Sequence, residues 1–330
     1  MPPPSLPSGK LPGRLLEQLL EHASGHDAAV RIGPAVGEDA AVIDVPAGAL
    51  VVASDPITLT AGEAGRYAVL INANDVAVTG VAPRWFLATV LLPTGTSEAA
   101  VRELFSLLTD ALDEVGATLV GGHTEVTAAV RAPVVVGQML GLAADGEVVA
   151  TGGAEPGHQL VQIGPAPVEG AAVLAAEHAA RLGGLDDEVL RAATAAAHDP
   201  GIGIVAPALR AARLGATAMH DPTEGGLAAG LHELAHASNV ALDLDGSALL
   251  WFEPGVEVCR RLGCDPWATL ASGCVLATFA ASQAQPAVED LIAEGHQAAV
   301  IGRVSTGRGV RVDGRSLVWP DRDEVSRLGD

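Results

Sequence analysis

The 330-residue chain has a single lysine, and this scarcity excludes two kinds of chemistry. Lys10 lies in a leader rich in proline, glycine and serine. The body of the chain therefore has no lysine to form a Schiff base with a carbonyl substrate or to contact a nucleotide phosphate in a P-loop. Aromatic residues are also few, at 3%, whereas apolar residues make up 49%. The cores must be built from Ala, Val, Leu and Ile, and a disordered chain is excluded.

Cysteine is also scarce, and no hydrophobic run is long enough to cross a membrane. Cys259, Cys264 and Cys274 match neither a disulfide framework nor a C-x-x-C zinc pattern, so we expect them to be reduced and buried. No run of about 18 apolar residues occurs without a polar interruption, and the first residues lack the apolar segment of a signal peptide. These features favour a cytoplasmic protein.

The charge is strongly of one sign. Acidic residues outnumber basic ones by 40 to 19, which gives a formal net charge of −21 at pH 7. A field of this sign repels nucleic-acid phosphates and anionic lipid surfaces. We therefore expect neither nucleic acid nor membrane as a partner.

Turn-forming residues divide the sequence into a flexible leader at 1–13, a first domain at 14–153 and a second domain at 154–330. The boundary segment 151–157 concentrates glycine and proline between two predicted strands. A short helix is expected at 15–22, and apolar residues at i, i+3, i+4 and i+7 over 101–115 predict a longer one. Both halves mix strands with single covering helices, which indicates layered α/β or α+β units.

Five acidic or glycine-rich clusters stand where predicted strands end. They are Gly37-Glu38-Asp39, Ser54-Asp55-Pro56, Asn72-Ala73-Asn74-Asp75, Gly121-Gly122-His123-Thr124-Glu125 and His220-Asp221-Pro222-Thr223-Glu224-Gly225-Gly226. Any one of them is typical of a plain turn or cap, because Asp, Asn and Gly favour turns. Together they fit a polyphosphate site without lysine, where carboxylates hold Mg²⁺ and the metal and backbone N–H groups hold the phosphates. In so acidic a chain, ATP would enter as its magnesium complex.

These five motifs, in this order and over essentially the whole chain, resemble the aminoimidazole-ribotide (AIR) synthase-related superfamily. That group includes AIR synthase, selenophosphate synthetase, thiamine-monophosphate kinase and the carbamoyl-dehydrating hydrogenase-maturation protein. The pattern is most similar to the hydrogenase-maturation branch, because of Gly9-Lys10-Leu11-Pro12 and the 220–226 motif. The resemblance implies a two-domain AIR synthase-like fold and a homodimer, in which the N-terminal halves pair their sheets into a shared β-barrel and the C-terminal α/β domains cap it.

The resemblance also implies an ATP site in the cleft between the halves. The implied metal ligands are Asp39, Asp55 and Asp75, with Glu125 as a further ligand. The implied nucleotide-binding residues are Gly37, Asn72, Asn74, Gly121, Gly122, Thr124, Gly225 and Gly226. Asp221 and Asp75 are the implied catalytic residues, with Asp221 facing the reacting phosphate. The expected cofactors are ATP and Mg²⁺, and the expected reaction is phosphorylation or dehydration of an oxygen acceptor.

Departures from individual family members leave the acceptor open. The sequence has no cysteine beside Lys10, unlike selenophosphate synthetases. Its last cysteine is Cys274, so carbamoyl dehydration on a C-terminal thiol is not expected in the usual form. The acceptor is an unidentified small molecule or protein. The alternatives are a thiamine-monophosphate-kinase-like enzyme and a non-catalytic nucleotide-binding scaffold with a partner in a maturation complex.

Two further motifs have competing interpretations. His232-Glu233-Leu234-Ala235-His236 matches the H-E-x-x-H signature of zinc peptidases, although it lies on a predicted helix with a leucine core face. A zinc peptidase is therefore the remote alternative. The segment 201–206 matches G-x-G-x-x-A, but no strand is predicted before it, so we interpret it as a loop leading into a helix.

Overall fold

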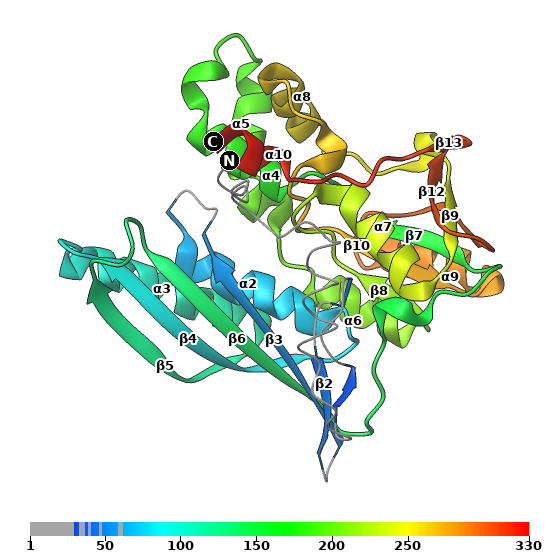
Figure 1. The fold of residues 1–330 in the computed structure, drawn as a ribbon, viewed down its shortest axis with the longest axis horizontal. Coiled ribbons are helices and arrows are strands. Elements are labelled where there is room, and N and C mark those ends of the chain that lie inside the picture. The colour runs from blue at the N-terminus through cyan, green and yellow to red at the C-terminus, as the bar shows by residue number, and fades with distance from the viewer. Residues whose placement is uncertain (1–29, 33–36, 39–40, 46–47, 59–61, 330) are drawn as a thin grey trace, which may run out of the picture.

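The computed structural model describes residues 30–32, 37–38, 41–45, 48–58 and 62–329. Among these residues, the first half of the chain forms one sheet with two helices (Figure 1). Its strands are β1 (Val30–Ile32), β2 (Ala41–Val45), β3 (Gly48–Ile57), β4 (Pro83–Pro93), β5 (Thr118–Thr127) and β6 (Val134–Ala143). Its helices are α2 (Ala64–Ala77) and α3 (Glu98–Val115).

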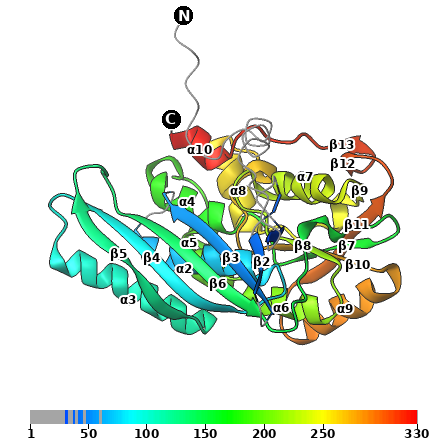
Figure 2. The ribbon, with the colours of Figure 1, turned by 60° about the horizontal axis from the view of Figure 1, so that its bottom comes forward.

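Within the described residues, the strand order of this first sheet is β1-β2-β3-β6-β4-β5. Neighbouring strands are antiparallel except β4 and β5, which run parallel. Side chains along β3, β4 and β6 alternate between buried and partly exposed, as expected when one face of a sheet is covered. Helices α2 and α3 cover that face, and no described helix covers the opposite one (Figure 2).

The second half forms another sheet, with strand order β13-β12-β9-β11-β7-β10-β8 among the described residues. Its strands are β7 (Gln159–Ile163), β8 (Ala218–His220), β9 (Ala241–Leu244), β10 (Val275–Phe279), β11 (Ala298–Ser305), β12 (Gly309–Val312) and β13 (Arg315–Ser316). Its helices are α4 (Glu169–Glu177), α5 (Asp187–Ala195), α6 (Val205–Arg213), α7 (Gly226–Ser238), α8 (Glu253–Leu262), α9 (Ala281–Ala293) and α10 (Glu324–Gly329). Helix α7 packs on one face of this sheet, and α6 and α9 pack on the other.

Helix α2 joins the two halves. Every residue of α2 except Arg66 is buried, because the first sheet lies on one side of the helix and second-half residues lie on the other. Its core is continuous with that of α4, α5 and α8. Polar side chains inside such a helix must find partners within the protein, and α2 carries three of them, Asn72, Asn74 and Asp75.

The expected α/β class is confirmed, and so is the helix expected up to residue 115. Ser97 caps α3 by accepting a hydrogen bond from the N–H of Ala100 at 3.2 Å, and Gly116 ends it in the left-handed conformation. The expected boundary segment 151–157 lies between β6 and β7. The helix expected at 15–22 lies outside the described residues. No helix in the described part of the chain has both the length and the hydrophobicity that crossing a bilayer requires.

Two of the clusters expected at strand ends lie inside regular elements instead. Residues 72–75 belong to α2, and residues 121–125 continue strand β5. The glycine pair does not break the strand because it lets β5 approach β4 closely. A Cβ on Gly122 would lie 2.0 Å from the carbonyl oxygen of Ala88, and Gly122 has a φ of +140°.

Candidate functional site

Asp55 is held at the end of β3 by a side chain of α2. Asn72 accepts a hydrogen bond from the N–H of Asp55 at 2.8 Å and donates to the carbonyl oxygens of Ala68 and Asp55. Gly137, on the neighbouring strand β6, makes room for this amide, since a Cβ there would lie 2.4 Å from Asn72 Nδ2. Asn72 therefore fixes the backbone that carries the Asp55 carboxylate.

Asn74 links α2 to the second half of the chain. Its side chain donates to the carbonyl oxygen of Ile202 and accepts from the N–H of Ile204, both at 2.9 Å. Both predicted nucleotide-binding asparagines thus engage backbone groups in this structure, and direct contact with a nucleotide stays a prediction for them. Asp75 follows on the same helix and is buried, at 5% exposure.

The loop 221–226 follows β8 and leads into α7. Asp221 is buried. Burial raises the pKa of the Cys274 thiol, a hydrogen bond from Gln162 lowers it, and the Asp221 carboxylate raises it further. The N–H of Gly226 donates to the carbonyl oxygen of Thr223 at 3.0 Å, and the N–H of Gly225 donates to a carboxylate from the end of the chain. Both predicted anion-binding amides are therefore engaged within the protein.

A small pocket lies between the two halves at this point. It has a volume of about 80 Å³. Asp55 lines it from the first half, together with Ile71 of α2, and Thr223 and Glu224 line it from the second half. Asp75 lies four residues after Ile71, one helical turn away on the same side of α2. The structure thus brings Asp55 to the 221–226 loop, and the convergence of Asp75 and Asp221 on this pocket stays a prediction.

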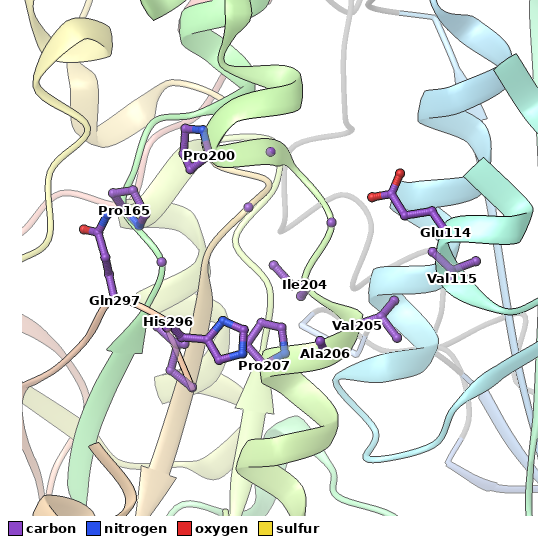
Figure 3. A pocket seen from close by; sticks show the side chains of 16 residues that line it. Glu114, Val115, Pro165, Pro200, Ile204, Val205, Ala206, Pro207, His296 and Gln297 are labelled. Atoms are coloured by element: carbon purple, nitrogen blue, oxygen red, sulfur yellow. The ribbon is translucent and has the colours of Figure 1, made fainter. Parts of the chain in front are cut away.

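A second pocket, of about 340 Å³, lies between the end of α3 and the loop before α6. Figure 3 shows Glu114 and Val115 on one side of it and Pro207 and His296 on the other. Gly273 lines this pocket and Ser272 lines the smaller one, so the turn at residues 272–273 separates the two pockets. None of the site residues predicted from the motifs lines the second pocket.

The segment 121–125 lies away from this junction. Asp55 pairs with Gly137 of β6, Gly137 with Ala88 of β4, and Ala88 with Gly122 of β5. Gly122 is therefore three strand spacings from Asp55, roughly 14 Å at about 4.8 Å per spacing. Glu125 is exposed on this edge strand, 3.4 Å from His123. Thr124 is exposed as well.

Gly37 lies against the second half, and Asp39 falls outside the described residues. A Cβ on Gly37 would lie 3.0 Å from the carbonyl oxygen of Glu233 on α7, and Gly37 has a φ of +88°. Glycine at this position therefore allows the backbone at residue 37 to approach α7 closely. The predicted role of Asp39 as a metal ligand stays a prediction.

Several polar residues line the junction pocket although the motifs predict no role for them. Thr223 and Glu224 belong to the 220–226 motif, and Ser272 lies just before β10. Glu169 is buried at the first position of α4, and the sequence offers no signal for it, because an acidic residue there is ordinary helix chemistry. Asp323 is also buried, and its spacing before α10 is typical of a helix cap.

The H-E-x-x-H match does not form a zinc site. His232 stacks on Trp319, with ring centroids 5.1 Å apart, and its Nε2 contacts the carbonyl oxygen of Leu317. Glu233 instead pairs with His220 at 2.8 Å. Among the described residues, no group of three or more His, Cys, Asp or Glu side chains is arranged to hold a metal ion. The zinc-peptidase alternative therefore has no structural support.

The G-x-G-x-x-A match is a loop leading into α6, as interpreted from the sequence. No strand precedes it, since α5 and a short turn at 197–201 do. Its Ile202 and Ile204 backbone groups are the partners of Asn74. The segment therefore fastens the two halves together.

The three cysteines are buried and free, as expected. Burial raises the pKa of the Cys259 thiol to about 12 and that of Cys264 to about 11. Burial also raises the pKa of Cys274 well above its usual range. A thiol with a raised pKa forms little thiolate at neutral pH, so none of these cysteines is poised as a nucleophile.

Two family models match the chain. The N-terminal domain of AIR synthase related protein matches residues 37–143, and the C-terminal domain of AIR synthase related protein matches residues 155–315. The chain belongs to the AIR synthase related family. It is 30% identical over 256 residues to the carbamoyl dehydratase HypE of Cupriavidus necator, covering 75% of this chain and 70% of that protein. It is also 34% identical over 221 residues to a thiamine-monophosphate kinase of Corynebacterium glutamicum, covering 65% of this chain and 63% of that kinase.

Solved structures show the same AIR synthase-like fold. A HypE chain in a HypE–HypF complex superposes with a TM-score of 0.75 at 22% identity, covering 92% of this chain and 99% of that one. AaThiL complexed with AMPPCP and TMP superposes with a TM-score of 0.70 at 20% identity, covering 92% of this chain and 93% of that one. The resemblance predicted from the five motifs is confirmed, including its hydrogenase-maturation branch.

Proposed function

We propose that this protein is a magnesium-dependent, ATP-utilising enzyme that transfers the γ-phosphoryl group to an oxygen acceptor, or uses that transfer to drive a dehydration. The observation that carries the proposal is the junction pocket, where Asp55 of the first half meets the 221–226 loop of the second half. Family membership supports it, as does the fold shared with a ThiL structure that holds AMPPCP, an ATP analogue.

The donor chemistry at the junction fits Mg²⁺. This ion is usually held by one or two carboxylates together with phosphate oxygens and waters, so a cage of three protein ligands is not required. In the proposal, Asp55, Asp75 and Asp39 hold the ion, which neutralises charge on the polyphosphate when bound. Asp221 orients the acceptor, and buried Asn72 and Asn74 keep α2 in place beneath it.

The acceptor atom in this proposal is oxygen. The three thiols are buried and their pKa values are raised, which supports a carboxamide, phosphate or water oxygen rather than a cysteine of this chain. The acceptor belongs to a small molecule or to a partner protein. A protein partner is supported by the likeness to a HypE chain that was solved together with HypF.

A second copy of the chain completes the site in this proposal. The uncovered face of the first sheet carries partly exposed apolar side chains, including Leu87 and Leu91 of β4 and Val136 and Leu140 of β6. Burying such a face against an identical one favours a dimer. The partner's 121–125 segment would then reach the junction that its own chain's segment does not. Leu91→Asp should yield a folded monomer in analytical ultracentrifugation, and an unchanged mass would contradict this interface.

Isothermal titration with ATP, with and without Mg²⁺, tests the proposed function. We expect about one ATP per chain and binding that requires Mg²⁺. Asp55→Asn and Asp75→Asn should weaken binding at least about tenfold, because each removes a metal-ligand charge worth about 1.4 kcal/mol or more. Asp145→Asn, an exposed aspartate of the first half, is the matched control and should bind normally. Absence of binding, or binding indifferent to Mg²⁺, would refute the proposal.

Thiamine-monophosphate kinase activity is the second candidate, favoured by the 34% identity to the Corynebacterium glutamicum enzyme. An assay with thiamine monophosphate and Mg–ATP separates it from the first. Formation of thiamine diphosphate would establish the kinase. ATP turnover that is indifferent to thiamine monophosphate would leave the maturation-type reaction.

A further inference from the structure

The loop 221–226 is held by a carboxylate from the far end of the sequence. Asp323, which is 4% exposed, accepts a hydrogen bond from the N–H of Gly225 at 2.7 Å. Its other oxygen accepts from the N–H of Val325 at 2.8 Å and so caps α10. One buried side chain therefore joins the last helix to the loop that carries Asp221.

The loop has a conformation that needs such a contact. Gly225 and Gly226 have φ values of +81° and +63°, in the left-handed region, and no side chain caps the start of α7. A Cβ on Gly226 would lie 2.6 Å from the carbonyl oxygens of Trp267 and Thr269, so glycine is required there. Two consecutive glycines give a flexible backbone, and the hydrogen bond from Asp323 restricts it.

Asp323 is itself well anchored. Upstream of it, Trp319 stacks on His232 with an interplanar angle of 9°, and the Leu317 carbonyl oxygen contacts His232 Nε2 at 3.1 Å. Downstream, Arg327 donates to the carbonyl oxygen of Gly263 at 2.9 Å. The C-terminal segment is thus fixed on α7 and at the end of α8, so the carboxylate is positioned before any ligand arrives.

The surroundings of this carboxylate are acidic. Burial raises the pKa of Asp323 to about 7, against the lowering effect of its two backbone N–H donors, and Glu224 and Glu169 raise it further. Glu224 faces it from the loop, Glu169 from α4 and the Cys259 thiol from α8. Its own helix adds Glu324, which pairs with Arg327.

We propose that Asp323 is a positioning residue of the nucleotide site, which holds Gly225 through its carboxylate and thereby fixes the 221–226 loop, and with it Asp221, at the junction pocket. This inference rests on the proposed function for its link to ATP, but the contact with the loop is independent of it. The ionised carboxylate is the stronger acceptor for the N–H groups of Gly225 and Val325, so these two contacts strengthen above neutral pH, even though ionising a buried carboxyl lowers the unfolding free energy of the whole protein.

Hydrogen exchange followed by mass spectrometry tests the contact without nucleotide. In Asp323→Asn, peptides covering 222–228 should exchange at least about tenfold faster than in the wild type, corresponding to about 1.4 kcal/mol of lost protection. Asp321→Asn, an exposed aspartate on the same segment, is the matched control. Thermal melting verifies that both variants fold. Unchanged exchange in a folded Asp323→Asn would overturn the proposal.

Titration with Mg–ATP then tests the positioning role. Asp323→Asn should bind at least about tenfold more weakly than the wild type at pH 8, and the ratio should shrink towards pH 6 as the wild-type carboxyl takes up its proton. Equal affinities of the wild type and Asp323→Asn at pH 8 would overturn the proposal. Tighter binding by Asp323→Asn would also overturn it, because the carboxylate would then be competing with phosphate.

The two measurements separate this proposal from the proposed function. If the wild type binds no ATP, the nucleotide site fails, and with it the nucleotide role of Asp323, whatever the exchange data show. If the wild type binds Mg–ATP and the loop of Asp323→Asn exchanges faster without any change in affinity, the site stands and only the positioning role fails.

Discussion

Two glycine-rich segments with similar composition have opposite surroundings in this protein. Residues 121–125 lie on the exposed edge strand β5, where His123 contacts Glu125 at 3.4 Å. Residues 221–226 are enclosed, with Asp221 buried and Gly225 bonded to Asp323. The motifs predict nucleotide binding for both segments from the same chemistry.

The surroundings of a motif are therefore set by the rest of the fold and not by the residues of the motif. The loop 221–226 receives its partners from Asp323, just before α10, and from the 267–269 segment, all in one chain. The segment 121–125 has no comparable set of neighbours within the described residues. In the proposed dimer a second copy supplies them.

The largest difference in stability is expected between two glycine-to-alanine substitutions, one in each segment. Gly226→Ala places a Cβ 2.6 Å from two carbonyl oxygens at a positive φ, which should cost about 3 kcal/mol or more of unfolding free energy. Gly121→Ala meets only the Leu87 side chain, at 3.6 Å, and should change stability by less than about 0.5 kcal/mol. Urea unfolding measures both changes, and equal losses of unfolding free energy would contradict the difference between the two segments.

The junction between the halves should respond next. Asn74→Ala leaves the buried carbonyl of Ile202 and N–H of Ile204 without their partner, which should cost about 2–4 kcal/mol. Gln285→Ala removes an exposed amide from α9 and is the control, expected within about 0.5 kcal/mol. If Asn74→Ala unfolds at the same urea concentration as its control, Asn74 does not fasten the halves.

The enclosed loop should also make stability depend on pH. Because the pKa of Asp323 is raised to about 7 in the folded protein, the folded state binds a proton that the unfolded chain has lost above about pH 4. The stability that this carboxyl contributes is therefore present below pH 4 and is lost as pH rises to 7, with a slope of up to about 1.4 kcal/mol per pH unit. The difference in unfolding free energy between wild type and Asp323→Asn should fall over this window. A flat difference would place the Asp323 pKa near its ordinary value.

The smallest effect is expected at the exposed edge. Glu125→Gln should change the unfolding free energy by less than about 0.5 kcal/mol, because its side chain is largely in water. Its effect should appear only in Mg–ATP affinity, and only in the dimer. A loss of affinity in Leu91→Asp monomers on adding Glu125→Gln would show that the segment acts within its own chain.

Most elements of the fold follow from local patterns. The helix ending at Val115 was predicted at this position, because apolar periodicity marks it clearly. The continuation of β5 through Gly121 and Gly122 was not, since pairing with β4 overrides the local preference of glycine for turns. The short strand β1 and helix α10 were also missed, because three to six residues carry too little periodicity.

The site was predicted in part. Of the predicted residues, Asp55 lines the junction pocket beside Thr223 and Glu224 of the 221–226 motif, and a shared site with Asp75 and Asp221 stays a prediction. Asn72 and Asn74 bind backbone groups in this structure, and their contact with a nucleotide stays a prediction. No sequence signal marks Glu169 and Asp323 as part of the site, because each is an ordinary helix-start residue in the sequence.

The sequence by itself determined the chemistry of this protein: an acidic, lysine-poor chain whose ordered motifs place it in the AIR synthase related family. Tertiary structure decided which of those motif residues meet. Asp323 is close to Gly225 only because the C-terminal segment packs across α7, and Glu125 is distant from Asp55 only because two strands lie between them. Such long-range contacts depend on how faces and edges are buried, which residue types and local spacing do not encode.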